Sequence, residues 1–263
     1  MKPSLTIIKV GGAVVEDEAQ LTQLLRDFTA IQGPKILVHG GGRRATKIAE
    51  RLGIETKMID GRRITDAEML EVVTMVYGGL VNKNVVARLQ ALGCNAIGLT
   101  GADANILLSQ KRPLKMVNGE PVDYGFVGDV KQASGSKIAH FIDADLIPVI
   151  APLTHDGQGH MLNTNADTMA SETAKAMAAV GYDVTLIYAF EKPGVLRDAD
   201  DDNSVIATIN HADFETYKAD GTISGGMLPK IENALAAIDA GVKRVIITKA
   251  TAIDGQHRTV ITK

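Results

Sequence analysis

Cysteine, tryptophan and long apolar runs are scarce or missing in this chain, and each shortage excludes a class of protein. Cys94 is the only cysteine among 263 residues, which excludes a disulfide framework or a cysteine metal cluster and fits a cytoplasmic location. Tryptophan is absent and aromatic residues make up 4% of the chain, which argues against a base-stacking surface for nucleic acid. No apolar run reaches the roughly 18 residues of a membrane span, and we expect no signal peptide.

The chain also lacks a large net charge of either sign. The formal net charge is -3 and the isoelectric point is near 6.1, so nothing draws the whole chain toward nucleic acid or an anionic membrane. Any anionic ligand must therefore be held by local positive groups. The six histidines are scattered without metal-ligand spacing, and we expect no protein-bound metal. The G-x-x-x-x-G-K-[ST] phosphate loop is absent as well.

Short apolar segments alternate with amphipathic ones along nearly the whole chain. This alternation predicts an α/β fold, in which parallel strands are joined by helical crossovers that cover both faces of one sheet. The expected strands are 5–10, 35–39, 94–99, 147–151, 184–189 and 243–248. The expected helices are 17–31, 43–52, 66–92, 136–144, 166–180 and 226–240.

Two segments interrupt this alternation. In 56–65, Asp60-Gly61 separates two extended runs, which predicts a β-hairpin because both turn positions favour positive φ. Thr65 and Glu68 have the spacing of a capping box for the next helix. The second segment, 106–127, predicts small antiparallel strands. Both segments could project from the sheet as flaps over a site.

Glycine clusters follow two of the expected strands. Gly11 and Gly12 come directly after Lys9-Val10, and Gly40 to Gly42 come directly after His39. Ligands of open α/β sheets bind beyond the carboxyl ends of the strands, where glycine lets peptide N–H groups approach phosphate oxygens. Either cluster alone could be a tight strand-to-helix turn. Two clusters with a lysine favour a phosphate site.

The C-terminal half adds polar residues at the starts of two expected helices. Asn163, Asn165 and Asp167 alternate in "LNTNAD", although one N-cap would be enough for that helix. Lys230 falls in or near the first turn of the helix after Gly225-Gly226, where a cation opposes the helix dipole unless an anion lies nearby. Two glycine loops, two lysines and a carboxylate predict a site for phosphoryl transfer, which depends on positioning and charge neutralisation.

The ordered motifs resemble those of the amino acid kinase family over nearly the whole chain, and most closely the branch that phosphorylates N-acetylglutamate. They are "IIKVGG", "ILVHGGG", "IDGRRIT", "GFVGDV", "IPVIAPL", "LNTNADTMA" and "ISGGMLPKI". The resemblance implies a three-layer αβα sandwich with a central, mainly parallel open sheet. It also implies an N-terminal lobe, 1–162, for the acylamino acid and dimerisation, and a C-terminal lobe, 163–263, for ATP.

The resemblance also implies roles for individual residues. Lys9 and Lys230 would stabilise the migrating phosphoryl group from opposite sides, and Asp167 would orient both lysines. Arg63 and Asn163 would bind the carboxylate and amide of the acylamino acid, and Arg63 suits a carboxylate because its planar fork binds bidentately. The glycines expected to donate backbone N–H groups to phosphate and acyl oxygens are Gly11, Gly12, Gly41 and Gly42.

The cofactor and partner expectations follow from the same resemblance. ATP is the phosphoryl donor, and Mg²⁺ is held mainly through the nucleotide phosphates. The acceptor is a carboxylate that is already ionised at neutral pH, so no catalytic base is needed. Arginine-inhibited members carry an additional N-terminal helix that builds hexamers. Lys9 lies so near the start of this sequence that the resemblance implies an arginine-insensitive homodimer.

One stretch departs from the family pattern, and three alternatives stay open. Where the family usually has Ser/Thr-Asp-Val-x-Gly near the adenine pocket, this chain has Ala189-Phe190-Glu191-Lys192-Pro193-Gly194, in which Glu191 could replace the aspartate. The altered stretch leaves open a catalytically impaired regulatory protein. The acyl group could be acetyl or another group such as succinyl. Finally, Gly40 to Ala45 with Asp60 fit a dinucleotide-binding fingerprint.

Overall fold

The computed structural model describes residues 2–59, 61–253, 255 and 257–263. Its centre is an eight-stranded sheet in the order β14-β16-β15-β13-β1-β2-β10-β5. Neighbouring strands are parallel except β16, which runs antiparallel to β15. The strands are β14 (Thr208–Ile209), β16 (Arg258–Ile261), β15 (Arg244–Lys249), β13 (Asp183–Phe190), β1 (Ser4–Val10), β2 (Lys35–His39), β10 (Ile147–Ile150) and β5 (Ala96–Leu99).

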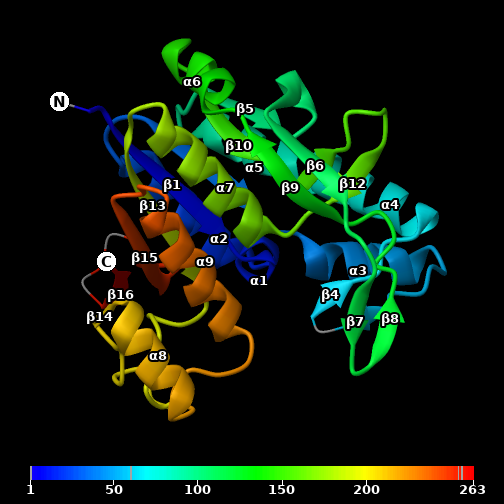
Figure 1. Cartoon of the computed structure of the whole chain (residues 1–263). Helices are drawn as coiled ribbons and strands as arrows, with labels where there is room; N and C mark the ends of the chain where they lie inside the picture. The colour runs from blue at the N-terminus through cyan, green and yellow to red at the C-terminus, as the bar shows by residue number, and fades with distance from the viewer. Residues whose placement is uncertain (1, 60, 254, 256) are drawn as a thin grey trace.

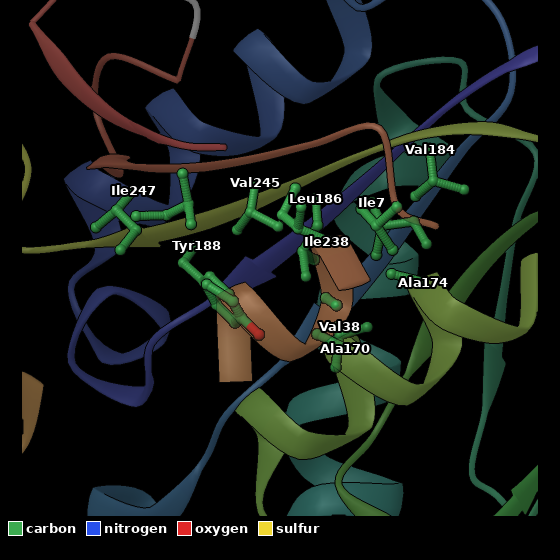
Figure 2. Close-up of a cluster of buried hydrophobic side chains, with 14 of the residues drawn as sticks. Ile7, Val38, Ala170, Ala174, Val184, Leu186, Tyr188, Ile238, Val245 and Ile247 are labelled. Atoms are coloured by element: carbon green, nitrogen blue, oxygen red, sulfur yellow. The ribbon is translucent and has the colours of Figure 1, made fainter. Parts of the chain in front are cut away.

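Helices cover both faces of this sheet, which confirms the predicted α/β sandwich (Figure 1). One face packs against α6 (Gly135–Asp143), α7 (Ala166–Ala179) and α9 (Met227–Asp239). Figure 2 shows Ile7, Leu186 and Val245 of three adjacent strands facing Ala174 of α7 and Ile238 of α9. The opposite face packs against α2 (Glu18–Ala30) and α5 (Asn82–Ala91). Alternate residues of β1 therefore enter two different cores.

All six expected strands and all six expected helical segments are present, with ends shifted by at most about two residues. The segment expected as one helix over 66–92 is divided in three: α4 (Ala67–Val73), a π-helix η1 (Thr74–Val81) and α5. The π-helix contains Gly78, where an added methyl group would come within 3.4 Å of Leu153, an ordinary packing distance. A π segment inside a helix is rare and is often found at functional sites.

The predicted hairpin over 56–65 is confirmed as β3 (Met58–Ile59) paired antiparallel with β4 (Arg62–Arg63). Gly61 has φ +69°, as a tight turn requires; Asp60 lies outside the described residues. The predicted capping box of Thr65 and Glu68 is wrong. Asp66 is the N-cap of α4 and accepts from Met69 N at 2.9 Å, while Thr65 is buried and donates to Arg63 O. Asp66 can cap because its carboxylate reaches an N–H of the first turn.

The segment 106–127 is confirmed as extended only in part. β6 (Leu107–Lys111) joins a four-stranded sheet in the order β12-β11-β6-β9, and β7 (Lys115–Val117) pairs with β8 (Glu120–Val122) as a separate hairpin. The last residues of the segment make only isolated bridges. The other strands of the small sheet are β9 (Gly128–Ala133), β11 (Leu153–His155) and β12 (Met161–Asn163). In Figure 1 the β7-β8 hairpin lies below α3 (Gly42–Arg51) and beside β4, away from the central sheet.

Several short elements carried too weak a pattern to be predicted. They are α1 (Gly12–Glu16), the 3₁₀ turn η2 (Asp103–Asn105), α8 (His211–Ala219) and the strands β9, β11, β12, β14 and β16. In α8 only Phe214 is buried, so the sequence shows no apolar stripe. Cys94 is buried beside α2 and α5, as a small core residue is expected to be. In the described ranges, no helix combines the length and the apolarity needed to cross a bilayer.

Candidate active site

Three chain segments leave the central sheet at the same edge, because β13, β1 and β2 are adjacent and parallel. Val10 is in register with both His39 and Ala189, so the two glycine clusters and Phe190 lie side by side. The glycine clusters are in direct contact. A methyl group on Gly12 would come within 3.3 Å of Gly41 N, and one on Gly40 within 2.9 Å of Gly12 N. Side chains at these positions would force the two loops apart.

The two lysines expected at the site converge on one carboxylate. Lys9 Nζ lies 2.7 Å from Asp167 Oδ1, and Lys230 Nζ lies 2.9 Å from Asp167 Oδ2. Lys9 comes from the end of β1, Asp167 from the first turn of α7, and Lys230 from the first turn of α9. Each ammonium has three N–H donors; Lys230 donates one to Asp167 Oδ2, and Lys9 forms an ion pair with Oδ1. Both cations therefore keep donors for an anionic ligand.

Burial and the neighbouring opposite charges shift the pKa values of this cluster in opposite directions. The side chains of Lys9, Asp167 and Lys230 are 10%, 14% and 28% exposed. Burial lowers the pKa of Lys9, and Asp167 opposes that shift while the charge of Lys230 adds to it. Burial alone would raise the pKa of Asp167, but the charges and hydrogen bonds of the two lysines outweigh it and hold that pKa well below its usual range. The cluster carries two cations and one anion.

Two cavities adjoin at the glycine loops and share Gly12 and Gly42 in their linings. The first, of about 210 Å³, lies toward the β3-β4 hairpin, and we call it the hairpin cavity. The second, of about 360 Å³, contains Lys9 and Lys230, and we call it the lysine cavity. The hairpin cavity is lined by Gly12, Gly40, Gly41, Gly42, Met58, Gly61, Arg62, Arg63, Tyr77, Val127, Pro152, Asn163, Thr164, Asn165 and Ala166. The lysine cavity is lined by Lys9, Gly11, Gly12, Ala13, Val14, Gly42, Arg43, Phe190, Glu191 and Lys230.

Arg63 lines the hairpin cavity as a buried cation. Its Nη2 donates to Gly42 O at 2.9 Å and to Thr46 Oγ1 at 2.8 Å, and its Nη1 donates to Thr56 Oγ1 at 3.2 Å. These acceptors are all neutral, and no ion pair to Arg63 is seen within the described part of the chain. A buried charge without a counter-charge is costly. The arrangement favours an anionic ligand at this guanidinium.

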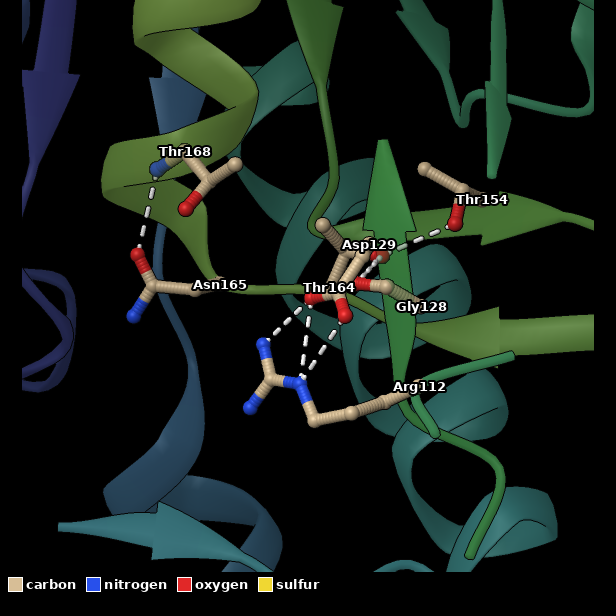
Figure 3. Close-up of polar contacts among 7 residues, drawn as sticks. All are labelled: Arg112, Gly128, Asp129, Thr154, Thr164, Asn165 and Thr168. Atoms are coloured by element: carbon tan, nitrogen blue, oxygen red, sulfur yellow. Dashed lines mark hydrogen bonds and ion pairs between the residues drawn. The ribbon is translucent and has the colours of Figure 1, made fainter. Parts of the chain in front are cut away.

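Both asparagines of "LNTNAD" line the hairpin cavity, and each also makes a hydrogen bond within the protein. Asn165 is the N-cap of α7, and its Oδ1 accepts from Asp167 N at 2.9 Å and from Thr168 N at 3.1 Å, as Figure 3 shows for Thr168. Asn163 donates through Nδ2 to Thr65 Oγ1 at 2.9 Å. Asn163 Oδ1 is then left as an acceptor and Asn165 Nδ2 as a donor, both in residues that line the hairpin cavity.

Glu191 lies at the edge of the lysine cavity and is exposed. Its Oε1 is 3.6 Å from Arg43 Nη2. The neighbouring Phe190 ring lies beneath Lys230, with its centroid 5.9 Å from Nζ. The departure from the family pattern at 189–194 therefore places an aromatic ring against one of the two lysines.

Tyr77, for which the sequence analysis predicts no role, also lines the hairpin cavity. Tyr77 is buried on the π-helix, and its ring leaves no room for a side chain on Gly41, where a Cβ would come within 2.8 Å. Burial raises the pKa of its hydroxyl, although Arg63 opposes the shift. The only sequence signal for this site was Gly78-Gly79 inside an otherwise helical pattern.

His39 contacts the second glycine cluster through a hydrogen bond to Gly40 O. It is fully buried, with Nδ1 2.8 Å from Gly40 O and Nε2 3.1 Å from Asn82 Nδ2. These partners fit a neutral ring in which Nδ1–H donates to the carbonyl and Nε2 accepts from the amide. Burial lowers the pKa of His39 to about 4, although the Gly40 bond opposes the shift.

This buried histidine predicts a defined pH dependence of stability. Between about pH 4 and 6.5 the unfolded chain binds a proton at this residue and the folded chain does not, so stability falls as pH decreases through that window. From pH 7.5 to 5.0 we expect a loss of about 2 kcal/mol from this group. Urea unfolding at the two pH values should give a smaller loss for His39→Gln. The exposed control His140→Gln should match the parent, and equal losses in all three proteins would contradict the assignment.

The dinucleotide-binding interpretation is wrong. It requires the segment near residue 60 to be a second parallel strand of the main sheet, but β3 and β4 form a separate antiparallel hairpin. Within the described ranges, no three His, Cys, Asp or Glu side chains are grouped as metal ligands. Asp167 itself has both oxygens engaged by lysines.

Comparison with known proteins gives a consistent family. The sequence profile of the amino acid kinase family matches residues 4–249. An acetylglutamate kinase from Bacteroides thetaiotaomicron is 64% identical over 263 residues, which covers 100% of both chains.

Solved structures share the fold. The smu.665 protein from Streptococcus mutans UA159 superimposes with a TM-score of 0.76 at 28% identity, over 98% of each chain. Carbamate kinase from Giardia lamblia bound to AMP-PNP gives a TM-score of 0.69 at 15% identity, over 99% of each chain.

Proposed function

The chain belongs to the amino acid kinase family, and we propose that it transfers the γ-phosphoryl group of ATP to the side-chain carboxylate of N-acetyl-L-glutamate, as a step of arginine biosynthesis. The observation that carries this proposal is the convergence of Lys9 and Lys230 on Asp167 where two cavities adjoin. An acceptor in the hairpin cavity and a nucleotide in the lysine cavity would meet at this cluster.

The two lysines would lower the main barrier of the reaction, which is repulsion between two anions. A carboxylate oxygen attacks the γ-phosphorus, a new P–O bond forms, and the bond to the β-phosphate oxygen breaks to release ADP and an acyl phosphate. The acceptor is already ionised, so no proton has to be removed. Lys9 and Lys230 would hold the equatorial oxygens as charge moves toward the leaving group. Asp167 would fix both ammonium groups before substrate binds.

The hairpin cavity offers the groups that an N-acylated amino acid requires. Arg63 would pair with the α-carboxylate, which supplies the counter-charge that this buried guanidinium lacks. Asn163 Oδ1 would accept from the amide N–H, because its Nδ2 is already bonded to Thr65. Free glutamate would carry an ammonium group at this position, close to a second cation. An N-acylated substrate avoids that repulsion.

The lysine cavity would hold the nucleotide. Gly11 and Gly12 would donate backbone N–H groups to phosphate oxygens at the start of α1, with Gly41 and Gly42 on the acceptor side. Glu191 would contact the nucleoside from the cavity edge. Mg²⁺ would be held mainly by the nucleotide phosphates, since Asp167 is engaged by lysines, and it would neutralise phosphate charge.

The proposal extends to the two lobes, the assembly and the location of the protein. Residues 1–162 would bind the acylamino acid and 163–263 the nucleotide, because Arg63 and Lys230 fall on those two sides. A homodimer would cover the exposed side chains of Met75 and Leu80 along η1 and of Leu92 after α5. The reaction consumes ATP, which fits the cytoplasm. Light scattering after size-exclusion chromatography tests the dimer.

A coupled assay of ADP release tests the proposed reaction. We expect ADP release that depends on N-acetylglutamate and MgATP, with an acyl phosphate that hydroxylamine traps as the hydroxamate. Free glutamate should be a poor acceptor. No hydroxamate with any N-acylglutamate would contradict the proposal and would favour a regulatory protein that has lost catalysis.

A further inference from the structure

A second arginine, Arg62, lines the hairpin cavity without a hydrogen bond or ion pair to the described residues. Arg62 is half-buried on β4 and faces the same cavity as Arg63 and Asn163. No hydrogen bond or ion pair of its guanidinium is found in the part of the chain that the structure describes. Among the described residues that line the cavity there is also no carboxylate. The lining described by the structure therefore carries two guanidinium charges and no carboxylate in direct contact with Arg62.

The nearest carboxylates are already engaged. Arg112 holds Asp129, with Nη2 2.5 Å from Oδ1 and Nε 3.0 Å from the same oxygen; Figure 3 shows the guanidinium of Arg112 turned toward Asp129. Asp167 is held by the two lysines. Burial lowers the pKa of Arg62 and Arg112 adds to the shift, yet a guanidinium stays charged in proteins. The charges of Asp167 and Asp129 oppose that shift, but among the described residues neither carboxylate forms an ion pair with Arg62.

Arg62 and Arg63 approach the cavity from different sides. Adjacent residues of a strand point to opposite faces. Arg63 is fixed against α3 through Gly42 and Thr46. The charged groups near Arg62 are instead Arg112 after β6, Asp129 on β9 and Asp167 on α7. One carboxylate bound to Arg63 would therefore leave Arg62 unpaired.

N-acetylglutamate has two carboxylates, and neither of them is available to pair with Arg62. Under the proposed function, the side-chain carboxylate faces the lysine cluster and the α-carboxylate faces Arg63. The remaining part of the substrate is the acyl group, which in acetyl ends in an uncharged methyl. Asn165 is held through Oδ1, and its Nδ2, without a hydrogen bond to the described residues, offers a donor for the acyl carbonyl oxygen.

We propose that Arg62 binds a carboxylate at the far end of the acyl group, so that the preferred acceptor is a glutamate acylated with a dicarboxylic acid, of which succinyl is the simplest test case. This proposal rests on the proposed kinase function and specifies its acceptor. A carboxylate extension supplies the counter-charge for Arg62, and a guanidinium recognises it through paired N–H donors. The reaction itself is unchanged.

Three acceptors distinguish the effect of the length of the acyl group from the effect of its charge. N-acetylglutamate lacks the extension, N-succinylglutamate carries it with a charge, and N-succinamoylglutamate carries it as a neutral amide of the same shape. For the parent protein we expect kcat/KM for the succinyl compound to exceed that for either of the other two by more than tenfold. Arg62→Met should lose this preference, Arg62→Lys should keep part of it, and the exposed control Arg51→Met should behave as the parent.

Each outcome decides the proposal. Equal or better use of N-acetylglutamate by the parent protein would overturn it and leave the kinase function standing. The same would follow if Arg62→Met lowered kcat/KM equally for all three acceptors, because Arg62 would then contact a part that they share. No acyl phosphate from any acceptor would overturn both proposals. Calorimetric titration of the three compounds without nucleotide gives an independent readout, and the affinity order should match.

Discussion

Replacing Lys9 or Lys230 by methionine is expected to lower kcat by about 10²–10³-fold, the cost of removing one fixed donor at a developing charge. Methionine keeps most of the apolar stem and removes the ammonium. The loss should fall on kcat much more than on KM, because charge between the reacting anions builds up in the transition state. Both lysines contact Asp167 from different elements, so each single variant leaves one cation in place.

Steady-state kinetics with both substrates varied measures this effect. Lys218→Met is a suitable control, since Lys218 forms an exposed ion pair with Glu232 outside both cavities, and its kcat should stay within about twofold of the parent. Near-normal turnover in both lysine variants would show that the two ammonium groups do not act on the phosphoryl group. A large rise in KM with unchanged kcat would make them binding groups only.

The sequence predicted this cluster because each member lies at a position that local structure alone does not explain. Lys9 closes a buried strand, and Lys230 opens a helix where its charge opposes the dipole. Strand order and the common edge of a parallel sheet then bring distant residues together. Such reasoning works where the apolar pattern is long and regular, as in β1 and α7.

Other parts of the site depend on contacts that one chain segment does not encode. Thr65 was expected to cap α4, but it is buried under Asn163 from a strand 98 residues further along, and Asp66 caps instead. Tyr77 reaches the hairpin cavity only because the helix takes a π turn there. Arg62 could equally have been a surface charge on the hairpin. What distinguishes the two possibilities is that Arg62 lines the cavity and makes no hydrogen bond or ion pair with the described residues.

The second large effect is expected from Asp167→Asn, which keeps the shape of the side chain and removes its charge. Lys9 is buried and lies near a second cation, and Asp167 is what raises its pKa against both influences. Without that carboxylate the pKa of Lys9 falls further, so a growing fraction of Lys9 is neutral as pH rises. We expect kcat/KM for ATP, which reports the free enzyme, to fall about 10²-fold at pH 8.

The pH profile separates this explanation from simple misfolding. Between pH 6 and 9 kcat/KM of Asp167→Asn should decrease more steeply with rising pH than kcat/KM of the parent, because loss of the carboxylate lowers the pKa of Lys9 further and deprotonation removes its charge. Asp183→Asn removes the carboxylate of another lysine–aspartate pair, with Lys243, outside both cavities, and its profile should follow the parent. A general loss of folded protein would lower activity without this slope. A profile of Asp167→Asn parallel to the parent would mean that the carboxylate does not set the charge of Lys9, and the electrostatic account of the cluster would then fail.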